Sequence, residues 1–401
     1  MHRICCLIGT LVLTALLAGC GPTDIVACDA QGCISEAKLS ANITNTLNNK
    51  VVGFVAIVGG IPSAFGGQAR TAADPPSFAM LPDLQTNLAS VSKTLTTVRV
   101  LQSLKKHGWT IDKPIASFIY SDWAQGPNIG KITFRDLMTH RSGFREGCGG
   151  SNTTFAVLKA QIAAGVTTAN MAVGSYNNCN FAIFRELLPR MEGVDLSPLP
   201  AAARAQQSAD LYISLMNQGV FQPLGIPSIG GGTAQCKPPP AGTTDILSYP
   251  NPPGTAHGTD WGDWTLACGG GGWVLTPADL FRVINDIATG NVLLTNDEKT
   301  QMFANCLGWD CSVRSDCPNP YVCKNGDLPN GPIAVWTYAG IFKCTVPVVV
   351  VVNSFLPAPY QPYDTSDNSI PSNGDIIGVV HAAYNAAAVA GTPKPCSGPA
   401  G

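Results

Sequence analysis

Apolar and polar positions along the chain predict strands near both ends and helices between them. Residues 51–58 are rich in β-branched side chains and end at glycines, which is typical of a buried strand. Three further strands are predicted in succession over 321–326, 333–342 and 346–353, with short turns that indicate a meander. Helices are predicted over 35–49, 90–104, 134–140, 178–191, 203–218 and 375–390, and from Thr276, a candidate N-cap followed by Pro277.

The order of these elements predicts an α/β fold, an antiparallel sheet flanked by helices with an inserted, mainly helical lobe. We expect the main domain to cover 50–395 and the lobe about 108–270, where proline, glycine and short helical stretches are frequent. Residues 21–49 are expected to form a tether and the first helix. At 401 residues the chain is long enough for two such lobes.

The helix predicted over 90–104 places a lysine among its inward positions. At 100° per residue, one arc is expected to face the core and holds Ser90, Thr94, Thr97, Val98, Val100, Leu101 and Leu104. The other arc is expected to face solvent and holds Ser92, Thr96, Arg99, Gln102 and Ser103. Lys93 belongs to the inward arc. Lowering a lysine pKa from about 10.4 to about 7 by burial corresponds to roughly 4.5 kcal/mol, so we expect this lysine to have a use.

The spacing of Ser90 and Lys93 is that of an activated nucleophile. One helical turn places the amine near the hydroxyl, so Ser90 would attack and a neutral Lys93 would take its proton. The Ser-x-x-Lys pattern also occurs at Ser35 and Ser103, but only Ser90 combines a helix start with an inward lysine. The alternative is that Lys93 extends past the core to solvent.

Composition argues against several classes of partner. The net charge is -2 and charged residues make up only 12%, which disfavours a phosphate-binding surface, so nucleic acid is not expected as a partner. The chain has no Cys-x-x-Cys motif and its five histidines are scattered, so we expect no metal site and no cofactor.

The N-terminus predicts export. Arg3 precedes an apolar run over 4–17 that is too short to cross a bilayer, which is typical of a signal peptide. Leu17-Ala18-Gly19-Cys20 resembles a bacterial lipobox, which implies lipidation at Cys20 after loss of residues 1–20. The alternative is an ordinary cleaved signal with a chance cysteine. By resemblance to sorting rules, Gly21 favours the outer membrane, so we expect an extracytoplasmic, lipid-anchored protein.

Cysteine usage agrees with an oxidising compartment. Of the fifteen cysteines, twelve remain after Cys5, Cys6 and Cys20 are set aside, and an even number in an exported chain indicates disulfides. Two close pairs are expected to form short clips, Cys28 with Cys33 and Cys317 with Cys323.

Four short segments occur in a family-like order. They are LASVSKT over 88–94, ITFRDLMTHRSG over 132–143, Tyr176-Asn177-Asn178, and GGWVLTPADL over 271–280. Together they resemble the serine β-lactamase and penicillin-binding family, most closely its class C β-lactamase and esterase branch. The resemblance spans about 50–390.

The resemblance implies roles for several residues. Ser90 matches the nucleophile and Lys93 its partner. Tyr176 matches a tyrosine that assists proton transfer, its anion stabilised by nearby lysines, and Asn178 matches an asparagine that holds the substrate; the alternative is that Tyr176 is a core aromatic. Cys148 follows the 132–143 segment and Cys179 follows the Tyr176-Asn177-Asn178 segment, so we expect them to form a disulfide that braces these two segments.

The third family motif has its best counterpart in Lys324-Asn325-Gly326. Asn325 replaces the usual hydroxyl, which weakens the grip on a substrate carboxylate. The backbone N–H groups of Ser90 and of a residue just after Gly326, Asp327, would form the oxyanion hole. The alternative for Lys324 is a lysine in a β-turn. His257-Gly258-Thr259 precedes 271–280 in the chain and is therefore in the wrong place for this motif.

We expect a serine hydrolase that cleaves an ester or amide of a small molecule or peptide through an acyl-Ser90 intermediate. Esterase, D-Ala-D-Ala-type peptidase and β-lactamase activities all fit, and Asn325 slightly favours the first two. The lack of Gly-x-Ser-x-Gly argues against an α/β-hydrolase. The alternative is a surface-anchored binding protein that has kept the fold without turnover.

Overall fold

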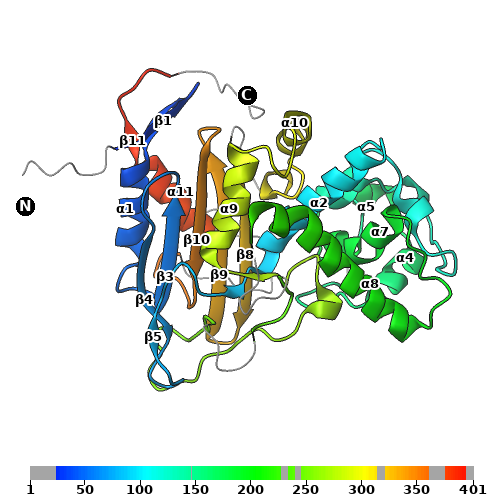
Figure 1. Cartoon of the computed structure of the whole chain (residues 1–401), viewed down its shortest axis with the longest axis horizontal. Coiled ribbons are helices and arrows are strands. Elements are labelled where there is room, and N and C mark those ends of the chain that lie inside the picture. The colour runs from blue at the N-terminus through cyan, green and yellow to red at the C-terminus, as the bar shows by residue number, and fades with distance from the viewer. Residues whose placement is uncertain are drawn as a thin grey trace, which may run out of the picture.

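The computed structural model describes residues 24–145, 147–226, 234–239, 245–313, 321–360 and 375–393. Figure 1 shows two lobes, with the sheet and its covering helices on the left and a helical lobe on the right. The predicted α/β class with an antiparallel sheet is confirmed. The signal peptide, Cys20, Gly21 and Cys317 lie outside the described residues. None of the helices in the described ranges is both long and apolar enough to cross a membrane.

The main sheet has six antiparallel strands in the order β5-β4-β3-β10-β9-β8. Their bounds are β3 Gly53–Val58, β4 Ala64–Arg70, β5 Phe78–Ala79, β8 Val322–Asn330, β9 Ile333–Phe342 and β10 Val346–Val352. Strands β3 and β10 are buried along their whole length, which explains their β-branched composition. The predicted strand and meander are confirmed, whereas β4 and β5 carry no strong apolar signal and were not predicted.

Helices cover both faces of the sheet (Figure 1). On one face, α1 (Glu36–Leu47) and α11 (Ile376–Asn385) pack in one apolar cluster with alternate residues of β3 and β10. On the other face, α2 (Ser92–Lys106) and α9 (Pro277–Ala288) pack against the intervening residues. Thr276 caps α9 as predicted, its side chain accepting from the Asp279 N–H at 2.9 Å.

The predicted tether is wrong over the residues that the structure describes. Strands β1 (Val26–Asp29) and β2 (Gly32–Ser35) form a hairpin that pairs with β11 (Ala388–Val389). Its turn is closed by the predicted Cys28–Cys33 disulfide. Asp29 also accepts from Lys343 Nζ at 2.7 Å, with both side chains buried. A disulfide and a buried ion pair therefore fix this short segment against the rest of the domain, so it is not a tether.

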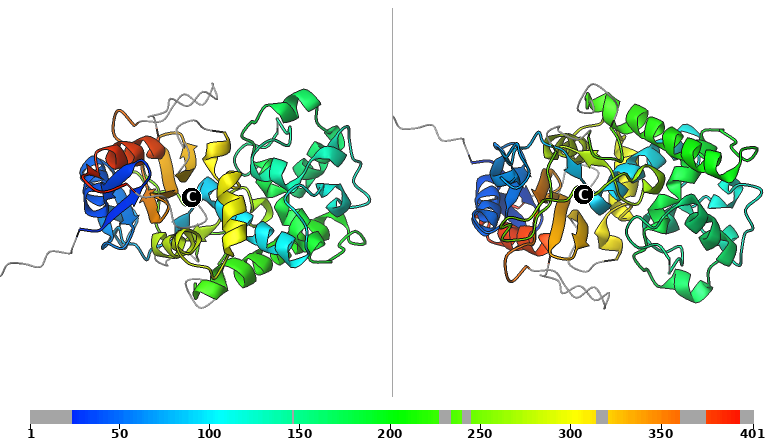
Figure 2. Two further views of the ribbon diagram at one scale, coloured as in Figure 1. Left: turned by 90° about the horizontal axis from the view of Figure 1, so that it is seen from above. Right: turned by 90° about the horizontal axis from the view of Figure 1, so that it is seen from below.

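The inserted lobe between α2 and α9 is mainly helical (Figures 1 and 2). Its α-helices are α3 Phe134–Met138, α4 Phe155–Ala164, α5 Thr168–Ala172, α6 Cys179–Ala182, α7 Phe184–Met191 and α8 Ala201–Met216. Short helical turns are η2 Ile115–Phe118, η3 Ile129–Lys131, η4 Asn217–Phe221, η5 Gln222–Leu224 and η6 Thr265–Ala267. Residues 245–249, predicted to belong to this lobe, instead contact the sheet. The Leu247 N–H donates to the Ala69 carbonyl at 3.1 Å and the Tyr249 N–H to the Asn353 carbonyl at 2.9 Å.

Two short strands, a helix and a helical turn lie outside the main sheet and the inserted lobe. Strands β6 (Thr86–Asn87) and β7 (Val274–Leu275) pair just before α2 and α9. Helix α10 (Asn296–Ala304) follows α9, and the short turn η7 (Asp310–Ser312) lies beside β8.

Helix α2 lies between the two lobes, and the prediction that one arc of it faces solvent is wrong. Ser92, Thr96, Arg99 and Ser103 are all buried. The inserted lobe covers them and supplies polar partners, because Thr96 bonds to Tyr212 of α8, and Arg99 and Ser103 bond to Glu192 after α7. A polar helical face therefore marks contact with hydrogen-bonding groups here, not with water.

Candidate active site

The turn before α2 presents Ser90 to a cleft between the lobes. Ser90 lies in η1 (Ala89–Val91), and Ala89 before it has φ +47°, a conformation that non-glycine residues seldom adopt. The Asn87 side chain holds this turn by accepting from the Ala89 N–H at 2.8 Å. The cleft has a volume of about 330 Å³. The residues that line it are Ala89, Ser90, Gly150, Tyr176, Asn178, Trp264, Gly270, Gly271, Asp327, Leu328 and Pro329.

Lys93 reaches Ser90 as predicted. Its Nζ lies 2.9 Å from Ser90 Oγ and 2.8 Å from Asn178 Oδ1, and it also donates to the Gly270 carbonyl. A neutral amine has two N–H donors and one lone pair. Because the two carbonyl oxygens take the two N–H groups, the lone pair is left for the Ser90 hydroxyl proton.

The surroundings of Lys93 favour its neutral form. Its side chain is fully buried, and this burial, together with the positive charge of Lys324, lowers the pKa of Lys93 well below its usual value. The carboxylates of Asp310 and Asp327 oppose the shift without reversing it. The alternative in which Lys93 extends to solvent is excluded, and the amine is suited to act as a base.

Tyr176 contacts the same hydroxyl from the open side of the cleft. Its hydroxyl donates to Ser90 Oγ at 2.5 Å, while 43% of the residue stays exposed, so it is not a core aromatic. Protein atoms around the phenol, and next the charge of Asp310, raise the pKa of Tyr176 well above 10. The sequence led us to expect a tyrosine anion stabilised by lysines. The structure instead favours a protonated phenol that donates.

Strand β8 carries the third predicted motif. Lys324, Asn325 and Gly326 lie within this strand, which excludes a β-turn lysine. A Cβ on Gly326 would lie 3.0 Å from Ser90 N and 2.5 Å from the Leu88 carbonyl oxygen, so only glycine lets β8 approach Ser90 this closely. Asp327, the next residue, lines the cleft.

Lys324 and Asn325 leave the strand in different directions. Lys324 Nζ lies 5.0 Å from the centre of the Tyr176 ring and forms a buried ion pair with Asp310. Asn325 is buried on the opposite face, where its Nδ2 lies 3.4 Å from Asp375 Oδ2. Neither Lys324 nor Asn325, both expected to bind substrate, is among the residues that line the cleft.

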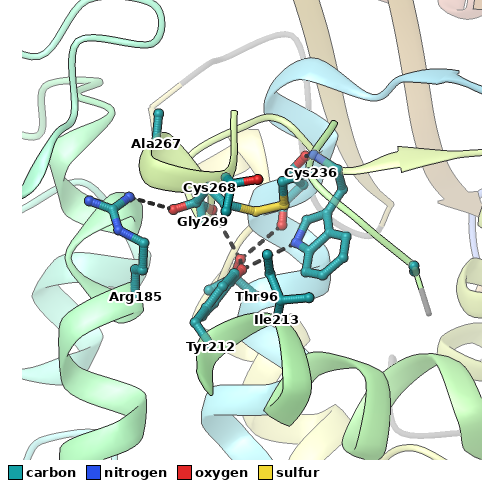
Figure 3. Close-up of a disulfide and its surroundings, with 12 residues drawn as sticks. Thr96, Arg185, Tyr212, Ile213, Cys236, Ala267, Cys268 and Gly269 are labelled. Carbon is teal, nitrogen blue, oxygen red and sulfur yellow. Dashed lines mark hydrogen bonds between the residues drawn. A yellow bond between two sulfur atoms is a disulfide. The ribbon is translucent and has the colours of Figure 1, made fainter. Parts of the chain in front are cut away.

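Two disulfides brace the walls of the cleft. The predicted Cys148–Cys179 bond is confirmed and holds the start of α6 directly after Asn178. A second bond joins Cys236 to Cys268 (Figure 3). The buried Arg185 donates to the Cys268 carbonyl at 2.9 Å, and Thr96 of α2 donates to the Gly269 carbonyl at 3.0 Å. These contacts fix the chain just before Gly270, whose carbonyl contacts Lys93.

Comparison with known proteins decides the family. The family model described as Beta-lactamase matches residues 36–310, which is more than half of the chain. This chain belongs to the Beta-lactamase family. The family resemblance expected from the sequence is therefore confirmed. No curated protein matches the chain.

Several solved structures share the family fold. A penicillin-binding protein homologue from Pyrococcus abyssi is 14% identical with a TM-score of 0.57, covering 81% of this chain and 74% of its own. A β-lactamase/D-alanine carboxypeptidase from Yersinia pestis is 17% identical with a TM-score of 0.56, covering 80% and 94%. A D-amino acid amidase from Ochrobactrum anthropi is 15% identical with a TM-score of 0.55, covering 86% and 98%. At these identities the likeness shows the fold alone.

The family site contains residues that the sequence analysis did not single out. His140, which lies inside the quoted 132–143 segment, places its ring centre 4.5 Å from that of Tyr176. Its Nδ1 accepts from the Asn177 N–H at 3.3 Å, and burial, followed by the charges of Lys93 and Lys324, lowers the pKa of His140. His140 is therefore neutral and packs against the Tyr176 ring. Asp310 has no local signal, because nothing near it in sequence indicates a partner on β8.

The other candidates serve the fold. Ser35 caps α1, its Oγ accepting from the Lys38 N–H at 3.0 Å. Ser103 bonds to Glu192 within the core. His257 is exposed and lies 3.0 Å from Asp74. Within the described ranges, no group of three or more His, Cys, Asp or Glu residues is placed to hold a metal ion.

Proposed function

We propose that this Beta-lactamase family member is a serine hydrolase that cleaves an ester or amide bond through an acyl-Ser90 intermediate. The observation that carries the proposal is the position of Lys93, whose N–H groups are taken by Asn178 and Gly270 while its third side faces Ser90 Oγ at 2.9 Å. A buried amine held in this way is a base ready to accept the serine proton.

The geometry supports a two-stage reaction. In the first stage Ser90 Oγ bonds to the substrate carbonyl carbon and its proton passes to Lys93, while the Ser90 and Asp327 N–H groups hold the oxyanion. The bond to the leaving group then breaks, Tyr176 gives that group a proton, and the Lys93 ammonium restores the proton to Tyr176. In the second stage water attacks the acyl carbon and gives a proton to Lys93. The bond between the acyl carbon and Ser90 Oγ then breaks, Lys93 returns the proton to Ser90 Oγ, and the acid product leaves.

Esterase and amidase or peptidase activity are favoured over β-lactamase activity. Asn325 stands where the family has a hydroxyl that grips a carboxylate, and its side chain points away from the cleft towards Asp375. Among the proteins with a similar fold, one is named a D-amino acid amidase and another a β-lactamase/D-alanine carboxypeptidase, so several acyl-transfer activities are compatible with this fold.

Covalent labelling tests the proposal. A fluorophosphonate probe should label the wild-type protein, and Ser90→Ala should abolish the labelling. Ser35→Ala is the matched control, since Ser35 also precedes a lysine by three residues but caps a helix, and it should label normally. Equal labelling of Ser90→Ala would place the nucleophile elsewhere. A lack of labelling and of ester turnover in the wild type would favour the binding-protein alternative.

We also propose an extracytoplasmic location with a lipid anchor at Cys20. Four disulfides join described cysteines, and Cys323 and Cys344 are disulfide-bonded as well, which supports folding in an oxidising compartment. Labelled palmitate should enter the protein in a bacterial host, and Cys20→Ala should block it. Unlabelled wild-type protein would contradict the anchor.

A further inference from the structure

The buried ion pair between Lys324 and Asp310 determines the charge of the site. Both side chains are only 1% exposed, and their charged groups are in direct contact. The second oxygen of Asp310 accepts from the Asn325 N–H at 2.9 Å, so the carboxylate is fixed to β8 at two points. Its own turn, η7, is closed by the disulfide between Cys306 and Cys311. Asp310 is therefore held against Lys324 by a rigid frame.

The pair removes the charge that β8 would otherwise present to a substrate. Lys324 is not among the residues that line the cleft, but its Nζ is 5.0 Å from the centre of the ring of Tyr176, which is. The Asp310 carboxylate already pairs with the Lys324 ammonium in a place that excludes water, where opposite charges attract each other strongly. A substrate carboxylate would have to compete with Asp310 for this ammonium.

The rest of the cleft supplies no replacement cation within the described residues. No lysine, arginine or histidine is among the residues that line it, and the one ionisable residue with a carboxyl group among them is Asp327. The nearby amine of Lys93 is fully buried and donates to two carbonyl oxygens. Trp264, Leu328 and Pro329 add apolar surface. An anionic substrate would therefore find no cationic residue among those that line this cleft.

We propose that Asp310 is a specificity-determining residue which, by holding Lys324, restricts the site to substrates that are uncharged around the scissile bond. Neutral esters and amides fit this site, and substrates that carry a carboxylate near the scissile bond, in the acyl or the leaving group, are rejected. Rejection by an unmatched charge is a form of negative selection. The inference rests on the proposed hydrolase function and adds the charge class of its substrate.

A matched pair of substrates tests this. The butyrate esters of 3-hydroxybenzoic acid and of methyl 3-hydroxybenzoate share one acyl group, and their leaving groups carry a free carboxylate in the first and its neutral methyl ester in the second. The wild type should hydrolyse the neutral ester with a kcat/KM at least about tenfold higher. Asp310→Asn frees the Lys324 ammonium and should shift the ratio towards the acid by about tenfold, mainly through KM. A merely structural defect would lower both rates and leave the ratio unchanged.

A double variant controls for the buried charge. Asp310→Asn with Lys324→Met removes both members of the pair, leaves no unpaired ion, and should restore the wild-type preference. The inference is overturned if the wild type or the double variant prefers the acid. It is also overturned if Asp310→Asn folds and its ratio of kcat/KM values for the two esters equals that of the wild type. If neither ester is turned over and fluorophosphonate does not label Ser90, the proposed hydrolase function itself fails. That result is distinct from turnover of both esters without a preference.

Discussion

Asn178 Oδ1 lies 2.8 Å from Lys93 Nζ, although 85 residues separate the two in the chain. The contact joins the inserted lobe to α2 and gives the lysine a fixed acceptor for one N–H group. Together with the Gly270 carbonyl, it leaves a neutral Lys93 with its lone pair towards Ser90. Several predictions on activity depend on this arrangement.

Activity should depend on pH through Lys93. Burial lowers the pKa of Lys93, and the base must be neutral to act, so kcat/KM should fall as the pH drops through that lowered value. Above it the rate should reach a plateau, because the pKa of Tyr176 is raised well above 10 and the phenol keeps its proton. A pH–rate profile of ester hydrolysis measures this. A rate that rises only near the usual lysine pKa would contradict a neutral Lys93.

Lys93→Met should lower kcat/KM by about 10²–10⁴-fold, the usual contribution of a general base. Its fold should be at least as stable as the wild type at neutral pH. A lysine that is protonated when unfolded and neutral when folded loses a proton on folding, and this destabilises the native state below the unfolded pKa. Steady-state kinetics and urea unfolding measure the two effects. Lys38→Met, at the exposed lysine that follows Ser35 by three residues, should change neither.

Tyr176→Phe should lower kcat/KM by about 10²-fold or more, because it removes the proton donor and leaves the ring on His140. Acylation by fluorophosphonate should slow as well. Thermal unfolding should stay near that of the wild type, because the hydroxyl lies at the open cleft. Full activity in this variant would assign proton transfer to the leaving group to another residue or to water.

Substitutions of two asparagines should affect different properties, activity for Asn178 and stability for Asn325. Asn178→Ala removes an acceptor of Lys93 and should reduce kcat/KM by about 10- to 100-fold through loss of orientation. Asn325→Ala should leave kcat/KM within about twofold, since its side chain faces Asp375. It should instead reduce the free energy of unfolding by about 1 kcal/mol. A large rise in KM for Asn325→Ala would show that the side chain reaches the substrate after all.

Glu192 should stabilise the contact between α2 and the inserted lobe. Its burial opposes ionisation, but hydrogen bonds from Lys106 and Ser103 and the charge of Arg99 outweigh this and lower its pKa from 4.5 to about 2. Glu192→Gln should reduce the free energy of unfolding by about 1–3 kcal/mol at pH 7, after allowance for solvent screening.

The Glu192 contribution has a defined pH window. Because the folded pKa is lowered, the stabilisation is complete above 4.5 and is lost as the pH falls towards 2. Urea unfolding at pH 7 and pH 3 should show the difference between wild type and Glu192→Gln shrinking at the lower pH. Asp195→Asn, at an exposed ion pair, should leave the free energy of unfolding nearly unchanged. A difference that does not depend on pH would contradict an ionic role.

Local patterns in the sequence determined most of the framework and the centre of the site. The β-branched runs of β3 and β10, the cap at Thr276 and the Ser90–Lys93 spacing depend on residues that are neighbours in the chain. Their physics operates within one strand or one helical turn, so a pattern of a few residues is enough to predict them.

Only the tertiary structure decided which polar groups meet across the chain. Ser92 and Ser103 appear exposed in a helical projection, yet both are buried, where Ser92 accepts from the Trp273 N–H and Ser103 donates to Glu192. Asp310 and Lys324 are ordinary charged residues until β8 and η7 pack together and bury both. Burial and long-range pairing arise from the packing of distant segments, and these set the protonation of Lys93 and the charge of the cleft. The sequence therefore determined which serine is the candidate nucleophile, and the fold decided which groups contact it and the kind of substrate that we expect it to accept.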